Sequence, residues 1–145
     1  MSFLDEITWR GLLHQTTAHE ELRAHLETPG RVAYAGFDPT ADSLTVGHLI
    51  PIMLLQHFQR AGHKPVVLIG GGTGLIGDPS GKDSERTLQT REHVDANVAG
   101  QRKVLERFLD FSAAKSNGAL LVNNADWLEK LGYLEVLRTI GKHFS

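Results

Sequence analysis

The chain has 145 residues, 41% of them hydrophobic and 22% charged, which is enough for one domain with its own core. This composition excludes a disordered or collagen-like chain. The formal net charge of −2 gives no overall positive field for binding nucleic acid. The chain contains no cysteine, which excludes disulfides and thiolate zinc sites and favours a cytoplasmic location.

The first 30 residues are expected to form an N-terminal helical segment that is neither a signal nor an anchor. Acidic Asp5 and Glu6 precede the apolar residues, unlike the basic start of a secretory signal. No stretch reaches the ~18 apolar residues of a membrane span. A short opening helix and a second helix over 17–27, capped by Thr16 or Thr17, are predicted.

Residues 31–145 alternate between strand and helix patterns. Apolar runs predict strands over 31–37, 64–69 and 119–122, and apolar spacing predicts helices over 47–61, 91–111 and 127–140. The first of these helices must start near Gly47, because Pro51 is tolerated only in a first turn, and Gly62 ends it. Thr90 is the expected cap of the second. The apolar stripe expected on the third consists of Leu128, Leu131, Leu134 and Leu137.

This alternation predicts an α/β fold with a parallel nucleotide-binding sheet of Rossmann type. Such sheets bind ligand at the carboxyl ends of their strands, and a second set of strands normally forms the other wall. We therefore expect this chain to hold the first half of such a domain.

The glycine-rich stretch VVLIGGGTGLIGDPSGK, residues 66–82, raises the question of which phosphate-containing ligand, if any, it binds. Residues 72–77 match the dinucleotide pattern G-x-G-x-x-G, but a turn sequence starting at Asp78 follows where a helix should open. The P-loop pattern fails at both ends, where Ile76 and Asp83 stand. We expect the glycines to leave the backbone bare, so that a ligand can lie against the strand end. Asp78 either accepts a substrate ammonium there or merely starts the turn.

The stretch YAGFDPTADSLTVGHL, residues 34–49, places His48 in the first turn of a helix that follows a strand. A helix N-terminus concentrates unpaired N–H groups and partial positive charge, which suits phosphates. Thr45 and His48 add donors at that point. Taken singly, such residues are more often capping or surface residues than ligands.

Five segments in order resemble bacterial tyrosyl-tRNA synthetases over essentially the whole chain: GFDPTADSL, TVGH, GGTGLIGDPSGK, SERTL and GKHFS. The second of them is similar to the HIGH signature of class I aminoacyl-tRNA synthetases. The resemblance implies activation of L-tyrosine with ATP and Mg2+ to tyrosyl-adenylate and pyrophosphate, followed by transfer of the tyrosyl group to tRNA(Tyr). ATP with Mg2+ enters as substrate, and neither a tightly bound cofactor nor a protein metal site is expected.

The resemblance also implies roles for individual residues. Tyr34 contacts the substrate phenol, and Asp78 and Asn124 hold the amino-acid end. Lys82 and Arg86 match a mobile loop whose cations close over pyrophosphate. The residues implied around adenylate, ribose and phosphates are Gly36, Asp38, Thr40, Thr45, Gly47 and His48. Without the resemblance, Tyr34 would be a strand aromatic that packs the core, and the two cations would be solvated charges.

Three positions depart from the family pattern, and one of them, Pro51, is compatible with the first turn of its helix. Thr45 stands where the signature usually has histidine, so a shorter hydroxyl must make the phosphate contact or leave it to water. Ala35 stands where cysteine is often found beside the ribose, a modest loss.

Much of the family pattern is expected to lie beyond Ser145: the second half of the domain, the KMSKS-type loop, the tRNA-binding domains and most of a homodimer interface. These 145 residues alone are therefore expected not to catalyse adenylation. The alternatives are a truncated, non-catalytic tyrosine- or nucleotide-binding or interaction module, and a nicotinamide oxidoreductase. The break at Asp78 and Pro79 argues against the last of these.

Overall fold

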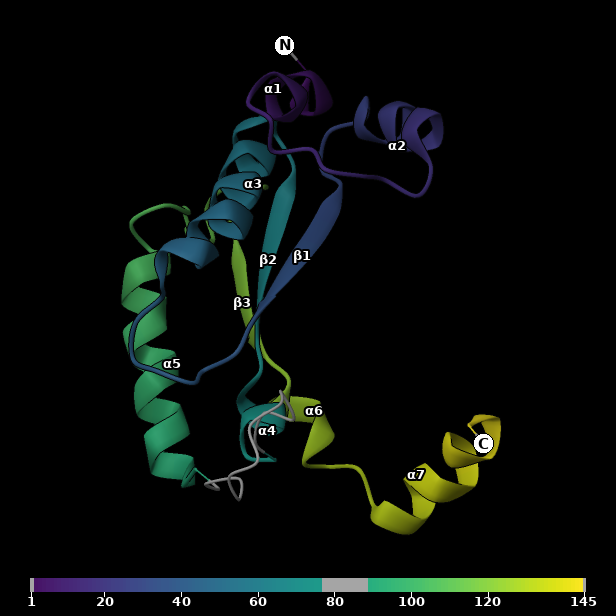
Figure 1. Ribbon diagram of the computed structural model, residues 1–145, viewed down its shortest axis with the longest axis vertical. Helices are drawn as coiled ribbons and strands as arrows, with labels where there is room; N and C mark the ends of the chain where they lie inside the picture. The colour runs from purple at the N-terminus through teal and green to yellow at the C-terminus, as the bar shows by residue number, and fades with distance from the viewer. Residues whose placement is uncertain (1, 77–88, 145) are drawn as a thin grey trace.

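The computed structural model describes residues 2–76 and 89–144 (Figure 1). None of the helices in these ranges is both long enough and apolar enough to span a bilayer. The elements in chain order are α1 (Phe3–Trp9), α2 (His19–Leu26), β1 (Val32–Phe37), η1 (Val46–His48), α3 (Leu49–Arg60), β2 (Lys64–Ile69), α4 (Gly71–Gly74), α5 (Arg91–Leu105), β3 (Leu120–Asn123), α6 (Ala125–Leu128), α7 (Tyr133–Thr139) and η2 (Gly141–His143).

The three strands form one parallel sheet in the order β1-β2-β3. Val32 lies opposite Lys64, and Val66 lies opposite Leu120. Parallel neighbours need a crossover connection, and α3 and α5 make the two crossovers. The predicted parallel α/β fold is confirmed.

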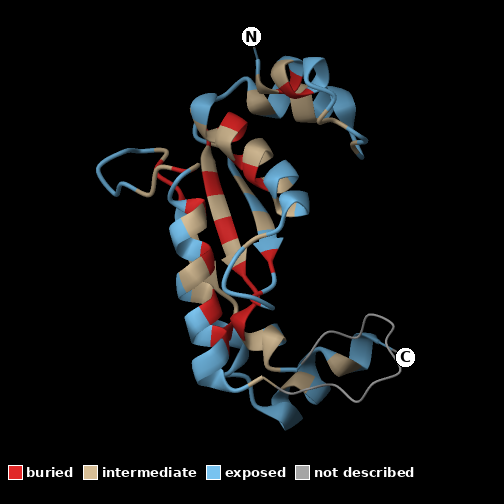
Figure 2. Ribbon diagram, turned by 60° about the vertical axis from the view of Figure 1, so that its left-hand side comes forward, coloured by how far each residue is buried: buried red, intermediate tan, exposed pale blue. Residues whose placement is uncertain are grey.

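Both crossover helices cover the same face of the sheet (Figure 1), as sequential right-handed crossovers do. Figure 2 shows the buried residues along the strands and on the sides of α3 and α5 that face them. Each fully buried aliphatic side chain contributes about 1.5–3 kcal/mol. The core cluster consists of Phe37, Ile52, Leu55, Val67, Ile69, Leu105, Leu109 and Ala119.

The opposite face of the sheet is largely open in the described part of the chain. Val32 is 64% exposed, Tyr34 71% and Leu120 46%. Successive side chains of a strand alternate between faces, so these residues lie opposite the helix-covered core. The sheet thus has one packed face and one accessible face.

The N-terminal helical segment packs against α3. Phe3 of α1 packs edge-on against Phe58 of α3, with ring centroids 5.3 Å apart. The second helix begins at His19, not at residue 17. The Thr16 hydroxyl accepts from the Ala18 amide at 3.2 Å, which makes a local turn ahead of the helix. The predicted threonine cap is therefore wrong.

Several predicted boundaries are confirmed. Pro51 lies in the first turn of α3, and Gly62 after its end has φ +88°. The Thr90 hydroxyl caps α5 by accepting from the His93 amide at 3.3 Å. β2 has the predicted limits, and β3 runs one residue later than predicted, as far as Asn123.

Two predicted helices are too long. α5 ends at Leu105 instead of Phe111, and beyond it the Asp110 N–H bonds to a side chain of α3. The helix expected over 127–140 is split into α6 and α7, with Gly132 in extended conformation at the start of α7. Glycine lowers helix stability by about 1 kcal/mol relative to alanine, which favours a break. The leucine stripe expected there is between 37% and 78% exposed: Leu128, Leu131, Leu134 and Leu137.

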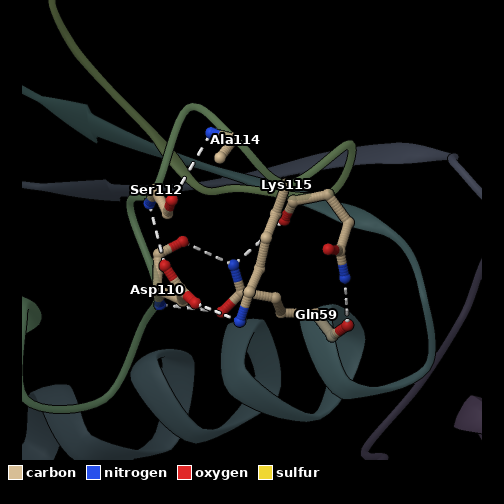
Figure 3. A network of polar contacts seen from close by, with 6 residues as sticks. Gln59, Asp110, Ser112, Ala114 and Lys115 are labelled. Carbon is tan, nitrogen blue, oxygen red and sulfur yellow. Dashed lines mark hydrogen bonds and ion pairs between the residues drawn. The ribbon is translucent and has the colours of Figure 1, made fainter.

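The side chain of Gln59 binds α3 to the segment that follows α5 (Figure 3). Its amide nitrogen donates to the Asp110 carbonyl at 2.8 Å and to the Asn117 carbonyl at 3.0 Å. Its amide oxygen accepts from the Asp110 backbone N–H at 3.0 Å. The same segment closes on itself through an ion pair between Lys115 and Asp110. Gln59 thus accepts from the Asp110 N–H, which in a longer helix would bond to the carbonyl four residues earlier.

Gln59→Ala is expected to lower the free energy of unfolding by about 2 kcal/mol, because three hydrogen bonds at a half-buried position are lost. Urea denaturation followed by circular dichroism measures this. The control is Gln56→Ala, which removes a single bond to the Phe108 carbonyl and should cost about 1 kcal/mol or less. Equal losses for the two variants would contradict the special role of Gln59.

Candidate functional site

The candidate site lies where the three parallel strands end. β1 leads to Asp38, β2 to Gly70, and β3 to Asn123 and Asn124. The carboxyl ends of parallel strands meet at one edge of a sheet, which is where α/β folds bind ligands. Figure 1 shows the short helices α4 and α6 close together at this edge.

The glycine-rich stretch begins as a one-turn helix, α4, packed against its neighbours. A Cβ built on Gly70 would lie 2.7 Å from Asp38 Oδ1, and one on Gly71 would lie 2.3 Å from Asn123 Oδ1. Neither distance leaves room for a side chain. The expectation that these glycines leave bare backbone for a ligand is wrong at both positions, because side chains of the protein itself fill the space.

Two asparagines bind the start of α4. Asn123 Oδ1 accepts from the Gly71 amide at 3.1 Å, and Asn124 Oδ1 accepts from the Gly72 amide at 2.7 Å. Asn124 Nδ2 donates to Thr73 Oγ1 at 3.1 Å. A dinucleotide site needs such N–H groups to face the pyrophosphate. Here the asparagines take two of them, the amides of Gly71 and Gly72, which argues against that arrangement.

Asn123 and Thr73 belong to this cluster, although the sequence did not single them out. The side chain of Asn123 bonds Gly71 N and also Ala125 N, at 3.1 Å each. Asn123 and Asn124 are both half-buried. The signal in the sequence was the pair of asparagines directly after an apolar strand. A pair of amides at the end of a buried strand favours hydrogen bonds with neighbouring backbone.

The second part of the site is the turn that carries Thr45 and His48. The Thr45 backbone N–H donates to His48 Nδ1 at 3.1 Å, and Thr45 Oγ1 lies 2.8 Å from the same nitrogen. An N–H donor requires an acceptor, so His48 Nδ1 carries no proton and the neutral ring has its proton on Nε2. The Thr45 backbone and hydroxyl thus both contact Nδ1 of the His48 ring, and neither contacts Nε2.

The end of β1 places the His48 ring. Phe37 is buried, and its ring centroid lies 6.1 Å from that of His48, with the planes 32° apart. Gly47, one residue earlier in η1, has only Thr45 Oγ1 near a built Cβ, at 3.7 Å. Asp38 and Thr40 follow Phe37 and are exposed, and the Thr40 amide donates to the Asp38 carbonyl at 2.9 Å.

Tyr34 and Gly36 lie on the open face of β1, two residues apart and so separated by about 7 Å along the strand. Tyr34 is 71% exposed, so the alternative that it packs the core is wrong. Among residues 2–76 and 89–144, no atom lies within 4 Å of a Cβ built on Gly36. The Tyr34 phenol and the Gly36 backbone therefore form an accessible surface on the part of β1 that precedes Asp38.

Three predicted site residues, Asp78, Lys82 and Arg86, lie outside the described residues. Within the described ranges, histidine, aspartate and glutamate side chains form no group of three or more that could hold a metal ion. The structure thus places the Asp38 carboxylate, the asparagine cluster and the His48 imidazole near the carboxyl end of one sheet, with the exposed Tyr34 phenol farther back on the open face of β1. Such a set can bind a ligand that has both polar and anionic parts.

Comparisons with known proteins agree on one family. The model of tRNA synthetases class I (W and Y) matches residues 28–145. The chain is 53% identical over 142 residues to a tyrosine–tRNA ligase of Clostridium beijerinckii, covering 98% of this chain and 34% of that protein. It is 52% identical over all 145 residues to a tyrosine–tRNA ligase of Geobacillus stearothermophilus, again 34% of that protein. The chain therefore spans about a third of the length of the relatives it matches.

Solved structures agree with the fold. A C-terminally truncated mitochondrial tyrosyl-tRNA synthetase of Coccidioides posadasii superposes with a TM-score of 0.75 at 30% identity, over 100% of this chain and 41% of that one. A tyrosyl-tRNA synthetase of Archaeoglobus fulgidus, solved with L-tyrosine, superposes with a TM-score of 0.66 at 18% identity, over 99% of this chain and 41% of that one. This similarity supports the fold alone. The resemblance drawn from the five sequence segments is confirmed, and the chain belongs to the class I tRNA synthetases of the tryptophan and tyrosine group.

Proposed function

We propose that this chain forms the N-terminal part of the catalytic domain of a tyrosine–tRNA ligase. One observation carries the proposal. Of the residues that the family pattern assigns to the substrates, Asp38 and Asn124 directly follow the carboxyl ends of β1 and β3, and Tyr34 stands on the open face of β1, in a chain 53% identical to such a ligase. Motif and geometry thus point to the same place.

The tyrosine side of the site is the open face of β1 and the asparagine cluster. The Tyr34 hydroxyl bonds the substrate phenol, and Asn124, together with Asp78, holds the amino-acid end. A site that offers a hydrogen bond to a substrate hydroxyl rejects the analogue that lacks it, because its own polar groups are then left unpaired. Phenylalanine is excluded on that ground.

The ATP side is the turn between β1 and α3. The tyrosine carboxylate attacks the α-phosphate of ATP, a new carboxyl–phosphate bond forms, and the bond to the leaving pyrophosphate breaks. Positioning and charge stabilisation are the main contributions of the protein. Gly36 and Asp38 line the adenylate. The residues that contact the ribose and phosphates are Thr40, Thr45, Gly47 and His48. Lys82 and Arg86 bind the pyrophosphate.

The same proposal extends to the conditions and partners of the reaction. ATP enters with Mg2+ as a substrate, and the tyrosyl group passes to tRNA(Tyr). The whole enzyme is proposed to be a cytoplasmic homodimer. These statements rest on membership of the family, because the chain spans about a third of its relatives.

The test compares this chain with a fusion to the remaining two-thirds of the Geobacillus stearothermophilus ligase, with which it aligns over all 145 residues. We expect tyrosine-dependent exchange of pyrophosphate into ATP by the fusion and none by the chain alone, which supplies only part of the site. A folded fusion without exchange would contradict the ligase proposal. Exchange by the chain alone would contradict the need for a second half. Tyrosine binding without exchange in both would favour a non-catalytic module.

A further inference from the structure

The loop of residues 38–45 carries the site residues Asp38 and Thr40. Two buried side-chain amides of α5 donate hydrogen bonds to its backbone. Asn97 Nδ2 donates to the Pro39 carbonyl at 2.9 Å. Gln101 Nε2 donates to the carbonyls of Asp38 and Ala41, at 3.0 and 3.1 Å. Three backbone oxygens of the loop are thus bonded to one helix.

These amides lie where a helix that covers a sheet would ordinarily place apolar residues. Asn97 is 3% exposed and Gln101 is 1% exposed, and the same stripe of α5 continues with the buried Val94 and Leu105. Burying an amide costs free energy unless its hydrogen bonds are made. Gln101 Oε1 has no hydrogen-bond partner among the described residues, so this position is not optimised for stability alone.

The backbone of α5 approaches the same loop closely. A Cβ built on Gly100 would lie 2.1 Å from the Asp42 carbonyl oxygen. On its other side the loop follows Phe37, whose carbonyl accepts from the Gly70 amide at 2.9 Å, and a Cβ built on Gly74 would lie 3.3 Å from Pro39 Cγ. The loop is therefore fixed between α5 and the end of β2.

The geometry points to Asn97 and Gln101 as positioning residues, an amide clamp that sets where Asp38 and Thr40 stand relative to ATP. They act through the backbone of the 38–45 loop and do not touch a substrate. This inference rests on the proposed function. It goes further by assigning to α5, which carries none of the family motifs noted above, a role in the ATP half of the site.

The first measurement is amide hydrogen exchange of the 145-residue chain with Gln101→Met, which keeps the volume and removes the donors. We expect exchange of residues 38–48 to accelerate about tenfold while that of β2 is unchanged, since local opening no longer breaks these bonds. Asn97→Leu, which removes only the bond to Pro39, should act in the same direction and more weakly. Unchanged exchange in both variants would overturn the clamp.

The second measurement is pyrophosphate exchange by the fusion described above. Gln101→Met should lower kcat/KM for ATP about 10- to 100-fold, because a displaced loop misaligns the reacting groups, and should leave the KM for tyrosine within about twofold. The matched control is Leu105→Val, a fully buried core change on the same helix without a bond to the loop.

The outcomes separate the two proposals. If Gln101→Met keeps the kcat/KM for ATP of the parent, or if Leu105→Val of equal thermal stability lowers it as much, the positioning role is overturned. A parent fusion without activity would count against the proposed function. In that case the hydrogen-exchange rates of the chain would still test whether Asn97 and Gln101 hold the 38–45 loop.

Discussion

Gly100→Ala is expected to destabilise the protein by about 3 kcal/mol, although the same change in an ordinary helix interior stabilises by about 1 kcal/mol. The added methyl group would lie 2.1 Å from the Asp42 carbonyl oxygen and 2.9 Å from its carbonyl carbon. Both are backbone atoms, so no side-chain rotation can relieve the overlap. Either α5 or the 38–45 loop must move.

The sign of the effect is the decisive quantity, and thermal or urea unfolding of the chain measures it. Ala99→Gly is the matched control, because Ala99 is exposed on the same turn of α5 and reports helix propensity alone. It should cost about 1 kcal/mol. A Gly100→Ala variant more stable than the parent would show that the helix and the loop are not in contact, which would also undermine the amide clamp.

The parts of this fold that the sequence predicts are those with a local physical cause. The strand at 64–69 is apolar throughout after its first residue, Lys64, as in a sheet that packs against helices, and its limits are correct. Pro51 and Gly62 fix the ends of α3 through a missing N–H and a positive φ. Parallel connectivity then places the site at the carboxyl ends of the strands.

The parts that the sequence does not predict depend on contacts between distant residues. α5 ends earlier than its apolar spacing predicts, and the Asp110 N–H beyond its end bonds to Gln59, 51 residues away. Asn97 and Gln101 fall within an apolar period, yet amides are usually exposed, so their burial is not visible in the pattern. The glycines of α4 suggested space for a ligand, whereas Asn123 fills it.

The same distinction applies to the site. The resemblance located Thr45 and His48, but it treated the threonine as a shortened substitute for a phosphate ligand. The structure shows its hydroxyl 2.8 Å from His48 Nδ1, where it sets the orientation of the ring. The structure therefore adds a contact with His48 to the phosphate role that the resemblance implies for Thr45, and that phosphate role stays a prediction.

Replacement of His48 by alanine in the fusion is expected to lower kcat/KM for pyrophosphate exchange by about 10²- to 10³-fold, the range for losing one preorganised donor to a developing anion. The ring is fixed on one side by Phe37 and on the other by Thr45, so its Nε2–H is oriented before ATP binds. Steady-state kinetics at saturating tyrosine measure the loss. The KM for tyrosine should change little, because Tyr34 and Asn124 are untouched.

Thr45→Val separates the imidazole from its orientation. Valine keeps the shape of threonine and the backbone donor to Nδ1, and removes only the hydroxyl. Losing one hydrogen bond of about 1 kcal/mol predicts a decrease of about fivefold, far smaller than for His48→Ala. His93→Ala, an exposed histidine on α5, is the control and should have no effect. If Thr45→Val were as damaging as His48→Ala, the threonine hydroxyl itself would be the phosphate ligand, and the assignment of that role to Nε2 would be wrong.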